Sequence, residues 1–208
     1  LANTHDYILF FTDKGKCHWL KVHEIPPGGR AARGRAIVNL LSTEPGEKVK
    51  AFVSVKTFDE EKFIIMATRK GRIKKTKLSA YGKPRKGGIY AIDICEGDEL
   101  IEAKITNGEN DIVLGTREGK SIRFPETDAR PMGRKTRGVI GIKLSTKEDY
   151  VVGMVVVRRE GTLLVATEKG FGKRTEVLQY RIQKRSGKGV LAMRTNKKVG
   201  KMVAIMEE

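Results

Sequence analysis

The chain has 208 residues, of which 39% are hydrophobic, and its 42 Lys and Arg residues outnumber 25 Asp and Glu residues to give a formal net charge of +17. This length and apolar content exclude an intrinsically disordered chain, and the two isolated cysteines exclude a disulfide framework and a zinc ribbon. Because no apolar run approaches the roughly 18 residues of a membrane span, we expect a cytoplasmic protein with no membrane partner, whose positive surface attracts a polyanion such as nucleic acid.

A short pattern recurs four times along the chain: an apolar run, a Thr, two polar residues and a Gly. The copies are YILFFTDKG, FIIMATRKG, DIVLGTREG and TLLVATEKG, ending at Gly15, Gly71, Gly119 and Gly170. A second Gly, preceded by basic residues and followed by an alternating apolar segment, lies 17 to 19 residues after each copy, at Gly34, Gly88, Gly138 and Gly189. Four copies in register predict four units, at approximately 1–56, 57–107, 108–157 and 158–208 within a single domain.

Each unit is predicted to supply about four β-strands, because its apolar runs are short, rich in Val, Ile and Phe, and bounded by Gly or charged turns. In the second unit we expect strands at 62–68, 72–78, 88–94 and 99–106. The third strand of a unit alternates, which predicts inward-facing pairs at Val38 and Leu40, Ile92 and Ile94, and Ile142 and Leu144. A four-stranded sheet cannot bury both faces alone, so the pattern predicts an all-β, propeller-like array of blades.

The loop between the second and third expected strands is basic in every unit. If the units surround a common axis, equivalent loops trace a band that can follow a curved phosphate backbone. Because only 6% of the residues are aromatic, backbone contact with duplex DNA is favoured over base stacking on single strands. For any one loop, a solvated segment that keeps a β-rich protein soluble is an equally good interpretation. The candidate DNA-binding residues are Arg30, Arg33, Arg35, Lys83, Arg85, Lys86, Arg134, Lys135, Arg137, Arg181, Lys184, Arg185 and Lys188.

No group of residues in the sequence has the pattern of a catalytic site. His18 lies beside Cys17, but neighbours on one strand point to opposite faces, so a thiolate pair is not expected. The glycines of the repeat are predicted to serve hairpin turns with positive φ, and no GxxxxGK[ST] phosphate loop is present. We therefore expect no active site, metal or cofactor in this chain.

Six long blocks of the chain carry a family resemblance: LANTHDYILFFTDKG, ARGRAIVNLLSTEPGEKV, FIIMATRKGRIKKTKLS, RKGGIYAIDICEGDELI, RFPETDARPMGRKTRGVIGIKL and TEKGFGKRTEVLQYRIQKRSGKG. They resemble the C-terminal domain of bacterial DNA gyrase A and its relative in topoisomerase IV. The resemblance implies a β-pinwheel, in which about four propeller-like blades exchange strands with their neighbours. It also implies that duplex DNA wraps around a basic rim without sequence specificity.

For the whole enzyme, the resemblance implies ATP-driven introduction of negative supercoils at the bacterial nucleoid. The implied partners are the N-terminal region of gyrase A and the gyrase B protein, and ATP and Mg²⁺ are implied only for that larger assembly. The breakage-reunion tyrosine and its arginine match no residue here. A different interpretation is a propeller scaffold that binds an acidic protein through one face.

One segment is similar to the QRRGGKG box of the family, and we refer to it as the box-like motif. It places three cations in a glycine-containing loop that can approach phosphates closely. In the family the box usually marks the first of about six blades, so the resemblance implies that the chain corresponds to part of the domain. The motif consists of Gln183, Lys184, Arg185, Ser186, Gly187, Lys188 and Gly189, with Ser186 in place of a glycine.

Overall fold

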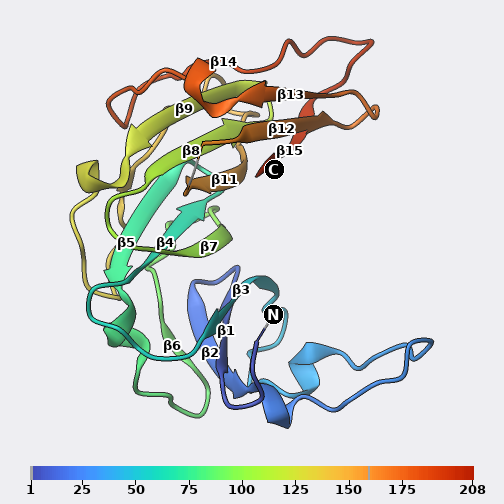
Figure 1. Ribbon diagram of the computed structural model, residues 1–208, viewed down its shortest axis with the longest axis vertical. Coiled ribbons are helices and arrows are strands. Elements are labelled where there is room, and N and C mark those ends of the chain that lie inside the picture. The colour runs from blue at the N-terminus through green and yellow to red at the C-terminus, as the bar shows by residue number, and fades with distance from the viewer. Residues whose placement is uncertain (1, 159) are drawn as a thin grey trace.

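The structure is a computed structural model that describes residues 2–158 and 160–208, and in these residues it is built from β-strands and short 3₁₀ helices (Figure 1). The strands are β1 (Tyr7–Thr12), β2 (Lys16–Lys21), β3 (Val49–Val55), β4 (Phe63–Thr68), β5 (Arg72–Lys77), β6 (Ile89–Tyr90), β7 (Leu100–Thr106), β8 (Asp111–Thr116), β9 (Lys120–Pro125), β10 (Val139–Ile140), β11 (Val151–Val157), β12 (Thr162–Thr167), β13 (Gly172–Glu176), β14 (Val190–Leu191) and β15 (Met202–Glu207). The 3₁₀ helices are η1 (Val22–Glu24), η2 (Ile37–Asn39), η3 (Leu78–Tyr81), η4 (Glu126–Asp128) and η5 (Val177–Gln179). The predicted all-β fold is confirmed.

The strands form four antiparallel sheets, which we call blades 1 to 4 in chain order. Blade 1 has the strand order β3-β1-β2-β6, blade 2 β7-β4-β5-β10, blade 3 β11-β8-β9-β14 and blade 4 β15-β12-β13. In blades 1 to 3 the last strand, β6, β10 or β14, comes from the next sequence repeat. This exchange of strands between successive units confirms the predicted β-pinwheel.

The blades are arranged along an arc, with β3, β7, β11 and β15 on its concave side (Figure 1). Contacts of β3 with β7, β7 with β11, and β11 with β15 connect these inner strands. The exchanged strands β6, β10 and β14 lie at the opposite edge of each sheet. We call that edge the outer side of the blades.

The hydrophobic cores lie between successive blades. One core joins Leu9 and Phe11 of β1 to Ile64 and Met66 of β4, so it contains residues of blades 1 and 2. Two further cores join blade 2 to blade 3 and blade 3 to blade 4 in the same way. Burial of apolar area between sheets therefore fixes each blade against the next.

The third strand predicted for each unit is much shorter than expected. In units 2 to 4 only two residues pair as strand. The inward side chains of Ile92 and Ile142 are nevertheless buried, as the alternation predicted. In unit 1 the prediction is wrong: the segment forms η2, and Val38 is 44% exposed. The physical reason is that this strand forms by pairing with a preceding blade, and the described residues hold none ahead of blade 1.

The repeat glycines adopt the predicted positive φ, for example 86° at Gly71 and 80° at Gly170. At Gly71 the structure adds a second reason for glycine. Its carbonyl oxygen accepts hydrogen bonds from the backbone N–H groups of Gly141 and Ile142, at 2.8 and 3.2 Å. A Cβ at Gly71 would lie 2.7 Å from the Ile142 carbonyl oxygen, whereas a Cβ at Gly170 would meet nothing within 4 Å. Because Gly71 has no side chain, the exchanged segment of the next unit can also pack closely against this turn.

A side-chain donor four residues after the repeat glycine connects each of the first three blades to the 3₁₀ helix region of the next blade. These residues belong to the second strand of their blade, and each donates to a backbone carbonyl group of a 3₁₀ helix. The donors and acceptors are Trp19 Nε1 to Tyr81 O at 2.9 Å, Lys75 Nζ to Glu126 O at 2.9 Å, and Arg123 Nη1 to Val177 O at 2.8 Å.

Candidate nucleic-acid interface

The basic loop 130–138 of the third unit is held by backbone hydrogen bonds to the preceding unit. The N–H of Met132 donates to the carbonyl oxygen of Lys75 on β5 at 2.8 Å. The carbonyl oxygen of Thr136 accepts from the N–H of Asp93 at 3.0 Å. The loop therefore has a fixed position across the outer side of blade 2.

The basic loop 181–189 of the fourth unit makes the same two connections 51 residues later. The N–H of Gln183 donates to the carbonyl oxygen of Arg123 on β9 at 2.7 Å, and the carbonyl oxygen of Gly187 accepts from the N–H of Lys143 at 2.8 Å. These bonds place the box-like motif on the outer side of blade 3, where loop 130–138 lies on blade 2. Equivalent basic loops thus occupy equivalent corners of successive blades.

Most of the predicted DNA-binding cations point to solvent. All of them are exposed except Arg134 and Arg185, which are half-buried. The three arginines of the first unit, Arg30, Arg33 and Arg35, lie in an exposed segment that extends away from blade 1 (Figure 1). The clusters of the other three units directly precede the exchanged strands β6, β10 and β14. The structure therefore brings three of the four clusters to the outer side of the blades.

Two predicted cations also hold protein groups. The Arg185 guanidinium donates to the carbonyl oxygens of Asp128 and Ile140 at 2.9 and 3.1 Å, which fixes the box-like motif to the third unit. Arg137 donates to the carboxylate of Asp93 at 3.0 Å, and this hydrogen bond raises the pKa of the guanidinium. The partners of Arg185 are neutral carbonyl groups, so its charge is not compensated, whereas the Asp93 carboxylate compensates Arg137.

Lys74 on β5 lies below the basic loop 130–138, and nothing in the sequence marked it as buried. Its Nζ donates to the carbonyl oxygens of Arg134, at 2.8 Å, and of Ala91. Burial, with a smaller effect of the Arg134 charge, lowers the pKa of Lys74 to about 7. Lys74 therefore supports the loop from the core side.

Three further cations on the outer side were missed by the sequence reasoning. They directly follow the repeat glycine, and that position is the signal that could have identified them. In the strand registers each of them lies directly opposite a residue of an exchanged strand. The pairs are Lys16 with Tyr90, Arg72 with Ile140, and Lys120 with Leu191.

The concave side of the arc differs in charge from the outer side. A groove there is lined by residues of β3, β7 and β11. Lys50 pairs with Glu99 at 2.8 Å, and Lys104 pairs with Glu102 at 2.9 Å. Because these cations are compensated by carboxylates, the groove does not continue the basic band.

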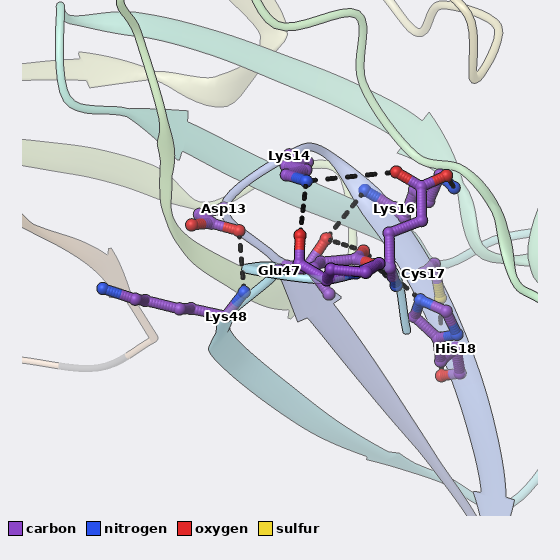
Figure 2. A network of polar contacts seen from close by, with 10 residues as sticks. Asp13, Lys14, Lys16, Cys17, His18, Glu47 and Lys48 are labelled. Carbon is purple, nitrogen blue, oxygen red and sulfur yellow. Dashed lines mark hydrogen bonds and ion pairs between the residues drawn. The ribbon is translucent and has the colours of Figure 1, made fainter. Parts of the chain in front are cut away.

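The buried polar network of blade 1 has a structural role (Figure 2). The Thr12 hydroxyl donates to Glu47 Oε1 at 2.6 Å, and His18 Nε2 lies 3.3 Å from the same oxygen. Burial opposes ionisation of Glu47, yet hydrogen bonds from Thr12, the Glu44 backbone and His18 outweigh it and lower the pKa of Glu47. Cys17 is buried in the core, and burial raises its pKa, so its thiol is unreactive.

Within residues 2–158 and 160–208, no group of three or more His, Cys, Asp or Glu side chains could hold a metal ion. In the same residues no helix has the length and apolar character needed to cross a membrane.

A family model described as the DNA gyrase C-terminal domain, beta-propeller, matches residues 6–56, 62–107, 110–158 and 161–206. The chain belongs to this family. The four matched segments follow the four repeats of this gyrase C-terminal domain chain, and the family resemblance of the sequence blocks is confirmed.

Curated relatives agree with this assignment to the gyrase C-terminal domain family. The chain is 45% identical over 201 residues to the DNA gyrase A protein of Chlamydia muridarum, a match that covers 96% of this chain and 24% of the relative. It is 42% identical over 207 residues to the DNA gyrase A protein of Klebsiella oxytoca, which covers 100% of this chain and 24% of that relative. The chain therefore spans about a quarter of the length of these relatives.

Solved structures agree on the fold. The C-terminal domain of DNA topoisomerase IV superposes with a TM-score of 0.88 at 26% identity, covering 99% of this chain and 64% of that chain. The DNA gyrase A C-terminal domain superposes with a TM-score of 0.85 at 23% identity, covering 100% of this chain and 67% of that chain.

Proposed function

We propose that this gyrase C-terminal domain chain binds duplex DNA without sequence specificity and wraps it around the outer side of the blades. The observation that carries the proposal is the repeated anchoring of basic loops, through Met132 and Thr136 on blade 2 and through Gln183 and Gly187 on blade 3. A solvated loop that only confers solubility needs neither a single sign of charge nor a repeated position. A curved phosphate backbone is matched by both.

The wrapping module works, in this proposal, as part of a DNA gyrase in the bacterial cytoplasm. The support is the match to DNA gyrase A relatives over nearly the whole chain. The N-terminal region of gyrase A and the gyrase B protein would supply strand passage and ATP hydrolysis. This chain would contribute the handed curvature of the DNA segment, and none of its residues is assigned a chemical step.

Equilibrium binding to a random-sequence duplex at increasing salt tests the proposal. If the chain neutralises about 6 to 10 phosphates, its affinity should fall by about 10³ to 10⁵ between 50 and 200 mM salt. An affinity that stays constant over this range would contradict phosphate binding.

Two charge reversals in the box-like motif test whether this loop contacts the DNA. Lys184→Glu with Lys188→Glu changes the charge of the box-like motif by four units, so both the affinity and the slope of log affinity against log salt should decrease. The matched control is Lys48→Glu with Lys56→Glu, which makes the same change at exposed lysines outside the basic loops. Equal losses for the two variants would show that only net charge matters and would contradict the proposed path.

A further inference from the structure

Apolar side chains are exposed at one equivalent position of each exchanged strand. Tyr90 on β6 is 51% exposed, Ile140 on β10 is 40% exposed and Leu191 on β14 is 56% exposed. Each lies two residues after the glycine that ends a basic loop. A single exposed apolar residue needs no explanation, but recurrence at the same corner of three blades indicates a shared surface.

A basic residue lies opposite each of these apolar residues, and Tyr90 and Ile140 each have a second one nearby. The opposite residues in the strand register are Lys16, Arg72 and Lys120, and Lys16 is also ion-paired with Glu44. Directly opposite residues of an antiparallel pair project on the same face of the sheet. Lys135 Nζ lies 5.7 Å from the centre of the Tyr90 ring. The Arg185 guanidinium lies against the backbone of Ile140, with a hydrogen bond of 3.1 Å to its carbonyl oxygen.

This arrangement of an apolar centre with neighbouring cations matches the surface of a duplex groove. Phosphates border the minor groove on both sides, and its walls are deoxyribose, whose carbon atoms are apolar. Where DNA curves around a protein, the minor groove that faces inward narrows, and its negative potential attracts cations such as those beside these apolar residues. An acidic protein surface would compensate the cations, but it would not present apolar groups at the repeated spacing of Tyr90, Ile140 and Leu191.

We propose that Tyr90, Ile140 and Leu191 form an apolar row that packs on the deoxyribose walls of the minor groove of the wrapped duplex. The proposal rests on the proposed DNA-wrapping function and adds apolar packing on deoxyribose to the electrostatic contacts of the basic loops. An apolar contact releases no counterions, so its contribution to affinity should be independent of salt. That property separates the row from the basic loops.

The test is duplex binding by the triple variant Tyr90→Thr, Ile140→Thr, Leu191→Thr, measured over the same salt range as the parent chain. Threonine retains a preference for β-strands, and all three positions are exposed, so the variant should keep the fold. Loss of three apolar contacts should weaken binding by about 10- to 100-fold at every salt concentration, with an unchanged salt slope. Tyr90→Phe alone should retain the parent affinity, because the ring rather than the hydroxyl makes the contact.

The matched control is Phe52→Thr, Val203→Thr, Met206→Thr, which removes three exposed apolar side chains from the inner strands β3 and β15. It should bind duplex as the parent chain does. A row variant that binds as tightly as the parent, or a control variant that loses as much affinity, would overturn the proposal and leave the basic band intact. A parent chain that does not bind duplex would instead overturn the proposed function.

Discussion

The Arg123 guanidinium on β9 donates a hydrogen bond of 2.8 Å to the carbonyl oxygen of Val177, across the boundary between blades 3 and 4. The same guanidinium forms an ion pair of 2.7 Å with Asp111 on β8. One side chain therefore stabilises its own sheet and orients the next one. Because the DNA path follows from the relative positions of the blades, such contacts connect stability to the proposed wrapping.

Arg123→Met should lower the free energy of unfolding by about 2 to 4 kcal/mol, since it removes the hydrogen bond to Val177 and leaves the largely buried Asp111 carboxylate without its partner. Urea denaturation followed by circular dichroism measures the change. Arg174→Met, at the equivalent position of blade 4, is the control. Because Arg174 is exposed, this substitution should lower the free energy of unfolding by less than about 0.5 kcal/mol. Equal costs at both positions would contradict the role of the blade boundary.

Gly119→Ala should destabilise the chain far more than Gly170→Ala, although the two turns have φ values of 83° and 80°. Both substitutions introduce backbone strain of about 1 kcal/mol. At Gly119 the new Cβ would also lie 2.1 Å from the carbonyl oxygen of Met193, whereas at Gly170 it meets nothing within 4 Å. We expect a loss of about 3 kcal/mol or more at Gly119, measured by thermal unfolding. Similar melting temperatures for the two variants would refute the close approach.

Lys74 should make stability depend on pH above neutrality. Its pKa of about 7 in the folded chain is below the ordinary value of 10.5, so the unfolded chain binds more protons between these values. Stability therefore rises with pH in that window, by up to about 1.4 kcal/mol per pH unit, and the full cost of the buried charge is present below pH 7. Lys74→Met should flatten the slope in urea titrations from pH 7 to 10, and Lys77→Met, at an exposed position on the same strand, should not. A parallel profile for Lys74→Met would contradict this assignment.

Ser186 has a φ of 68°, the only positive φ of a non-glycine residue in the described part of the chain. A left-handed backbone costs a side chain-bearing residue about 1 kcal/mol relative to glycine. Ser186→Gly should therefore stabilise the box-like motif, with a gain of up to about 1 kcal/mol in the free energy of unfolding, measured by urea denaturation. A loss of stability would show that the serine makes a compensating contact.

Local chemistry explains what the sequence predicted well. The repeat period, the hairpin glycines such as Gly71 and the runs that form β1, β4 and β8 depend on neighbouring residues alone. The strand exchange followed only from the family resemblance, because a two-residue strand such as Ile89–Tyr90 has no signal of its own. Its pairing with Lys16 and Cys17 is decided by the preceding blade.

The basic loops of the candidate interface were predicted from the sequence, but the buried lysines that support them were not. The basic loops were visible because their charges recur at fixed spacing. Lys74 and Lys75 were not, since two lysines in a polar strand are typical of a solvated face, yet both are buried. Their donors reach carbonyl oxygens of other units, at Arg134 and Glu126, and contacts between distant segments leave no local pattern.

DNA minicircle topology measures the central claim most directly. The chain is added to relaxed circles at low salt, topoisomerase I relaxes them again, and the linking number is read after removal of protein. Wrapping of one hand around the outer side should shift the linking number in a single direction, in proportion to bound chain, and Lys184→Glu with Lys188→Glu should reduce the shift. Saturated binding with an unchanged linking number would contradict the wrapping account.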